Sequence, residues 1–181
     1  MARDGGPLFG GRSVGDLRRS VLADIRERAA HLDPESRADI PETMFLVGVL
    51  GQYDLTLPDL HFERAFSRDV EIDGRPHLEI HLPMAGKPRN LHLSPPGPGL
   101  DPDVATALEY QLVDGDCCLQ LPLEEDSPAD VDLATDELLA LAEDRYQRVR
   151  RELEALRQEA YDTAVDRYRR ETRSRGSGFT V

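Results

Sequence analysis

The segment from Pro128 to Arg173 places the strongest constraint on the fold, because it reads as one long helix. Ser127 followed by Pro128 gives an N-cap residue and a first-turn proline, the preferred order at a helix start. An apolar seam repeats at spacings of three and four, close to a coiled-coil heptad, through Tyr146, Val149, Leu153 and Leu156. Roughly 40 helical residues span about 60 Å, longer than a domain of this size is wide. The seam must therefore pair with the N-terminal helix, with a second copy of the chain or with another protein.

Two Asp-Gly pairs predict hairpins in the middle of the chain. A two-residue loop at Asp114-Gly115 gives one apolar face, with Leu112 opposite Cys117, Tyr110 opposite Leu119 and Leu108 opposite Leu121. At the earlier pair, Asp73-Gly74, a three-residue loop over residues 73–75 is needed to keep the apolar residues of both strands on one face of the sheet. That register sets Phe66 opposite Leu82 and Val70 opposite Leu78. A third strand over Arg89–Ser94, with Leu91 opposite Leu82, completes a meander.

These elements predict an α+β fold with a five-stranded, mostly antiparallel sheet, made of the three-strand meander and the second hairpin. An N-terminal helix follows Ser13, because an apolar stripe recurs at helical spacing from Val14 to Ala29. A short buried helix is favoured over a strand between Pro41 and Gly51. The predicted domains are a flexible N-terminus (1–12), an α+β domain (13–127), a long C-terminal helix packing on it and projecting from it (128–173) and a flexible tail (174–181).

Charge and composition narrow the function classes. The formal net charge is −13, which keeps the body of the protein away from nucleic acid and anionic membranes. The sequence shows no apolar run long enough for a membrane span and no signal peptide, so we expect a cytoplasmic protein without membrane contact. Adjacent strand residues point to opposite faces, so Cys117 and Cys118 are expected to be plain thiols.

The strongest candidate for a reactive site is a cluster of histidines and carboxylates on the polar face of the meander. The predicted registers bring together His81, His92, Glu79 and Asp69. Two histidines and carboxylates can form an open transition-metal site or carry out acid-base catalysis. The simpler interpretation is an ordinary solvated sheet face, which is common in antiparallel sheets. We favour that interpretation and expect no cofactor.

The C-terminal end of the long helix reverses the charge of the chain. Ten arginines and six acidic residues lie between Arg145 and Arg175. The cluster that we expect to touch a partner comprises Arg169, Arg170, Arg173 and Arg175. Arginines suit the negative end of the helix dipole, whereas contact with nucleic acid is a possible but less favoured role for them.

The order of these elements resembles that of YbjN-like proteins and the related type III secretion chaperones. The local resemblance covers residues 114–123 and the following helix through Tyr146. It implies a small, acidic, non-enzymatic protein that dimerises and holds another polypeptide.

The sequence therefore predicts a chaperone-like adaptor rather than an enzyme. It would dimerise or hold a partner through its C-terminal helix, with the coiled-coil seam and the arginine end as contact residues. Two alternatives remain open. One is a metal-dependent enzyme that uses the histidine face, and the other is a nucleic-acid-associated factor that uses the arginine end.

Overall fold

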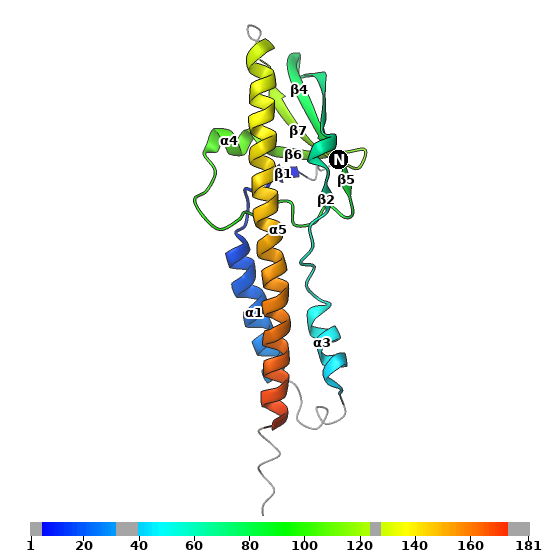
Figure 1. Ribbon diagram of the computed structural model, residues 1–181, viewed down its shortest axis with the longest axis vertical. Helices are drawn as coiled ribbons and strands as arrows, with labels where there is room; N and C mark the ends of the chain where they lie inside the picture. The colour runs from blue at the N-terminus through cyan, green and yellow to red at the C-terminus, as the bar shows by residue number, and fades with distance from the viewer. Residues whose placement is uncertain (1–4, 32–39, 124–127, 174–181) are drawn as a thin grey trace, which may run out of the picture. The chain divides into compact units, whose positions relative to one another are not determined.

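The computed structural model describes residues 5–31, 40–123 and 128–173 (Figure 1). The chain forms two compact units, and neither is continuous in sequence. Unit 1 comprises Met1–Val14 and Thr56–Arg151, and unit 2 comprises Gly15–Leu55 and Glu152–Val181. This grouping differs from the predicted division at residues 13–127 and 128–173, because helix α5 (Pro128–Arg173) contributes to both units.

The sheet of unit 1 is antiparallel throughout and has the order β1-β6-β7-β4-β3. Its strands are β1 (Gly5–Pro7), β3 (Phe66–Ile72), β4 (Arg75–Leu82), β6 (Glu109–Val113) and β7 (Asp116–Pro122). The shorter elements are β2 (Asp59–Leu60), which pairs with β5 (Met84–Ala85), a 3-10 turn η1 (Phe62–Arg64) and α4 (Pro102–Ala107). The α+β class is confirmed, but the predicted set of strands is not matched.

The hairpin β6–β7 has the predicted two-residue loop and register. Tyr110 lies opposite Leu119 and Leu112 opposite Cys117. Asp114 and Gly115 both have positive φ, at 53° and 96°, as a tight hairpin turn of this kind requires. Leu108 does not pair with Leu121, because it follows α4 and lies outside β6.

The hairpin β3–β4 corrects the predicted register by one residue. Its loop also contains two residues, since Asp73 and Gly74 both adopt positive φ, and Ile72 pairs with Arg75. Phe66 therefore faces His81 and not Leu82, and Val70 faces His77 and not Leu78. The one-residue shift moves every β3 side chain to the other face of the sheet, so that Arg68 lies opposite Glu79.

The predicted third strand at residues 89–94 is wrong. β7 pairs with β4 in its place, with Leu119 opposite Ile80. Residues 89–94 form turns that bond to the N-terminal segment, where Phe9 N–H donates to Leu91 O at 2.7 Å. The expectation of a flexible N-terminus is therefore corrected for residues 5–12, because β1 pairs with β6 and both Leu8 and Phe9 are buried. Residues 1–4 and 174–181 lie outside the described part of the chain.

The core of unit 1 forms on one face of the sheet. Its buried strand residues are Leu78, Ile80, Leu82, Tyr110, Cys117 and Leu119. The first stretch of α5 contributes Tyr146. Its ring centroid lies 5.9 Å from that of Phe9 and 5.7 Å from that of Phe62. Its hydroxyl donates to the backbone carbonyl oxygen of Pro58. The neighbouring Arg145 is also buried and donates from Nε and Nη2 to Phe9 O, at 3.0 and 2.7 Å. These two bonds fix the N-terminal segment against α5.

Unit 2 is helical and contains α1 (Val14–Ala30), α3 (Glu42–Leu50) and the second stretch of α5. Arg18 of α1 forms ion pairs with Glu152 and Glu159, which places α1 beside α5. The ring of Phe45 in α3 stacks on Tyr168 at 5.3 Å, and the Tyr168 hydroxyl donates to Ile40 O. The predicted short helix near residue 45 is therefore confirmed, although it buries only one face.

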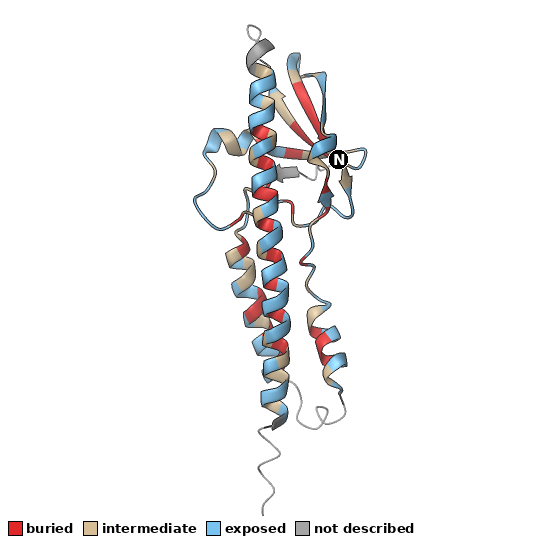
Figure 2. Cartoon of the chain, in the orientation of Figure 1, coloured by how far each residue is buried: buried red, intermediate tan, exposed pale blue. Residues whose placement is uncertain are grey.

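The apolar seam of α5 is buried within the chain (Figure 2). Helix α5 has the predicted bounds, Pro128 to Arg173. Its buried residues keep helical spacing through both units: Leu138, Ala142, Tyr146, Val149, Leu153, Leu156, Ala160 and Ala164. Among residues 5–31, 40–123 and 128–173, the structure contains no helix whose length and apolar character would let it cross a membrane.

One substitution made at two positions of α5 tests this burial. Leu156→Ala should lower the free energy of unfolding by about 2–5 kcal/mol, because it empties a fully buried site. Leu133→Ala should change it by less than about 0.5 kcal/mol, because Leu133 is 61% exposed. Urea unfolding of both variants measures the difference, and equal effects would contradict the packing of α5.

Candidate functional site

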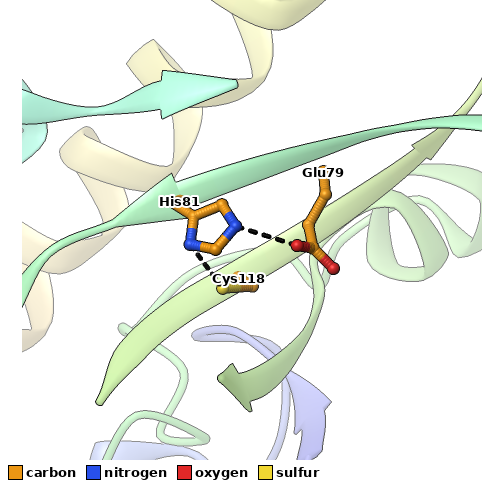
Figure 3. Close-up of side chains that lie close together, drawn as sticks. All are labelled: Glu79, His81 and Cys118. Carbon is orange, nitrogen blue, oxygen red and sulfur yellow. Dashed lines mark hydrogen bonds and ion pairs between the residues drawn. The ribbon is translucent and has the colours of Figure 1, made fainter. Parts of the chain in front are cut away.

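Three chemically reactive side chains meet on the sheet face opposite the core of unit 1 (Figure 3). Glu79 and His81 lie two residues apart on β4 and therefore share a face. Cys118 lies directly opposite His81 on β7. All three side chains are buried, and one ligand atom from each lies within 4.8 Å of the others.

The histidine ring bridges the carboxylate and the thiol. His81 Nε2 lies 2.8 Å from Glu79 Oε1, and His81 Nδ1 lies 3.3 Å from Cys118 Sγ. An ionised carboxylate can only accept, so Nε2 carries the proton and donates to Glu79. In the neutral ring Nδ1 is then a free acceptor, to which the Cys118 thiol donates. The ring itself is held by Phe66, which stacks on it at 4.7 Å with an interplanar angle of 10°.

Glu79 is kept ionised by the groups around it. Arg68 Nε donates to Oε1 at 2.8 Å, and Gln120 Nε2 donates to Oε2 at 3.4 Å. Burial by itself disfavours the charge, but the hydrogen bonds from Arg68, His81 and Gln120 outweigh it and hold the pKa of Glu79 below its ordinary value. The buried charge is thus paired and hydrogen-bonded, the condition under which a buried carboxylate is tolerated.

A second carboxylate approaches the histidine from its other side. Asp116 stands at the start of β7, and its Oδ2 lies 3.4 Å from His81 Nδ1. Its side chain is partly exposed, whereas His81 and Cys118 are buried. Asp116 therefore lies between the cluster and solvent.

The thiol is not activated in this arrangement. Burial, followed by the negative charges of Glu79 and Asp116, raises the pKa of Cys118 to about 12. Burial also raises the pKa of Cys117. A catalytic cysteine needs a lowered pKa or an accessible thiolate, so the geometry does not favour nucleophilic catalysis.

The structure brings together two of the four predicted metal ligands. Glu79 and His81 share the cluster, whereas His92 is an exposed turn residue and Asp69 is exposed and pairs with Leu78 on the other face. The prediction was wrong for His92 because no third strand forms at residues 89–94, and wrong for Asp69 because the β3 register is shifted by one. Pairing β4 with β7 would have revealed Cys118, which the sequence analysis missed.

The predicted partner-binding residues are used within the chain. Tyr146, Val149, Leu153 and Leu156 are all buried. Arg169 pairs with Glu42 at 3.1 Å, and Arg170 pairs with Asp166 one turn earlier in α5 at 2.9 Å. The side chain of Arg173 and the whole of Arg175 lie outside the described part of the chain.

A different surface of unit 2 is apolar and open. Met44 and Val47 of α3 are 67% and 75% exposed, although Phe45, Leu46 and Val49 of the same helix are buried. A side chain added at Gly48 would meet nothing within 4 Å. We call Met44, Val47 and Gly48 the outer face of α3.

Comparison with protein-family models, with curated proteins and with solved structures gave no match for this chain. The resemblance to YbjN-like proteins and type III secretion chaperones therefore stays a prediction.

Burial of the two cysteines leads to a direct chemical test. At about pH 8 both native thiols should react slowly with the Ellman reagent, because they are inaccessible and protonated. Unfolding in guanidinium should release two fast-reacting thiols per chain. A native thiol that reacts as fast as free cysteine would contradict the buried position of the cluster.

Proposed function

We propose that this protein is a non-enzymatic adaptor that binds another polypeptide through the outer face of α3. The observation that supports it is the exposure of Met44 and Val47, two large apolar side chains one helical turn apart. Contiguous exposed apolar surface is typical of protein-binding sites, whereas isolated apolar residues are not informative.

The opposite side of α3 is firmly held. The stacking of Phe45 on Tyr168 and the ion pair between Glu42 and Arg169 both join α3 to α5. A rigid helix loses little conformational entropy when a partner docks, which favours binding. Gly48 beside Val47 leaves room for the close approach of a partner backbone.

The contact surface differs from the one that the sequence suggested. The α5 seam is buried against its own chain and cannot hold a partner without opening the fold. Met44 and Val47 on the outer face of α3 are already exposed, so a partner could bind there without opening the fold. We infer that its occupant is an amphipathic helix of a partner protein, which would cover Met44 and Val47 by helix-on-helix packing.

Site-specific crosslinking tests this proposal. A photoreactive benzoylphenylalanine placed at Val47 should give a crosslinked product in the native cell, and the product should disappear when Met44 is changed to Lys. The matched control is the same probe at Ala23, an exposed residue of α1 in the same unit.

The mass of the crosslinked product separates the two possible occupants. A product at twice the mass of the chain identifies a second copy and would overturn the hetero-partner inference. Equal labelling from Val47 and Ala23, or no product that depends on Met44, would contradict the adaptor function. Circular dichroism of Met44→Lys checks that α3 remains folded.

The nucleic-acid alternative makes a different prediction. Arg169 and Arg170 each pair with an acidic residue, so their charge is partly compensated. We expect fluorescence anisotropy to show no sub-micromolar binding to random duplex or single-stranded DNA in about 150 mM salt. Tight binding that falls steeply with salt and is lost in Arg169→Ala with Arg170→Ala would favour the alternative.

A further inference from the structure

His81 Nδ1 lies beside two further atoms that can bind a metal ion. The proton on Nε2 leaves Nδ1 with a lone pair when the ring is neutral, and this lone pair faces both Cys118 Sγ at 3.3 Å and Asp116 Oδ2 at 3.4 Å. The sulfur and the carboxylate oxygen both lie close to this nitrogen. Once the Cys118 thiol has lost the proton that it donates to Nδ1, a positive charge beside these atoms would be stabilised.

We propose that His81 Nδ1, Cys118 Sγ and Asp116 Oδ2 bind a divalent transition-metal ion, for which Zn²⁺ is the best fit. One imidazole, one thiolate and one carboxylate are all ligands that zinc accepts. The site lies in unit 1, and it is independent of the adaptor function proposed for α3.

The two distances from His81 Nδ1 match edges of a zinc tetrahedron. Bonds of about 2.0–2.3 Å at tetrahedral angles separate two ligand atoms by about 3.3–3.6 Å. The distances from Nδ1 to Sγ and to Oδ2, 3.3 and 3.4 Å, fall within or at the edge of this range. These two ligand–ligand distances are therefore already close to their expected zinc-bound lengths.

Glu79 has the role of the positioning residue and not of a ligand. Its Oε1 already accepts hydrogen bonds from His81 and Arg68, so it is not free to bind a metal ion. Metal-binding histidines commonly donate their second N–H to a carboxylate, which fixes the tautomer and the ring orientation. Arg68, Glu79 and His81 form such a chain, and the stacked Phe66 holds the ring from its face.

Binding of zinc at this site would release one proton, from the Cys118 thiol. The Cys118 thiol loses its proton to solvent as the sulfur–metal bond forms, while His81 binds through its existing lone pair without losing a proton. Asp116 gives a partly exposed route into the cluster. Three protein ligands leave the fourth position of a tetrahedral zinc site for water.

Metal titration of the full chain, with any affinity tag removed, tests the proposal. Isothermal titration with Zn²⁺ should show one equivalent per chain with a dissociation constant below about 1 μM. Co²⁺ should give a thiolate-to-metal charge-transfer absorption and the visible bands of tetrahedral coordination. This absorption reports a sulfur ligand directly, so it distinguishes the site from weak binding at surface carboxylates.

The variants separate ligands from positioning residues. Cys118→Ser should abolish the charge-transfer band, and His81→Ala and Asp116→Asn should weaken binding. Glu79→Gln should weaken it by about 10–100-fold without removing the band. The matched controls are Cys117→Ser, on the opposite sheet face, and His92→Ala, an exposed histidine outside the cluster; both should bind as the unmodified chain does.

Two results would overturn the proposal. One is the absence of a cobalt–thiolate band together with no stoichiometric zinc binding by the unmodified chain. The other is unchanged zinc affinity in Cys118→Ser and His81→Ala, which would place the metal elsewhere. Near-ultraviolet circular dichroism of each metal-free variant shows whether lost binding reflects a lost ligand or a lost fold. If Cys118→Ser is unfolded, the cobalt–thiolate band decides the question, because it should be lost in His81→Ala and kept in Cys117→Ser.

Discussion

The structure depends on the need to bury one apolar stripe along the whole of α5. A helix of 46 residues cannot keep such a stripe out of water by itself, and its stability comes from packing more than from helix propensity. Unit 1 supplies Phe9 and Phe62 as neighbours of Tyr146, and unit 2 supplies α1 and α3. The polar contacts follow the same stripe, since Arg145 and Tyr146 both bond to backbone carbonyls. The seam is thus satisfied within one chain.

The two faces of the sheet solve different physical problems. The core face is apolar, and its register follows from keeping Leu112 opposite Cys117 and Tyr110 opposite Leu119. The other face buries a charged carboxylate, which is tolerated only because Arg68, His81 and Gln120 surround it. Such a network restricts each member to one orientation. The position of the Cys118 thiol is consequently fixed by interactions that begin at an arginine on a strand two places away.

Sequence reasoning succeeded where local chemistry decides the outcome. Proline at the start of α5, its helical spacing and the Asp114-Gly115 turn each act over a few residues, and their predictions agree with the structure. It failed where distant segments compete for one partner. Both residues 89–94 and β7 offer alternating apolar residues to the edge of β4, and nothing local shows that β7 pairs there. The predicted site contained that error. His92 would join the site only if residues 89–94 paired with β4, whereas Cys118 joins it because β7 pairs with β4. The predicted loop that begins at Asp73 was one residue too long, and this error likewise placed Asp69 on the wrong face of the sheet.

The discontinuous layout of the two units has a consequence for synthesis of the chain. β1 leaves the ribosome well before its partner β6, which begins about a hundred residues later, and α5 follows later still. Neither unit can complete its core until the C-terminal helix has emerged. Leu8, Phe9 and the apolar stripe of α1 are therefore uncovered until α5 has been made, a state in which apolar segments attract chaperones. The chain order makes the folding of each unit wait for its part of α5.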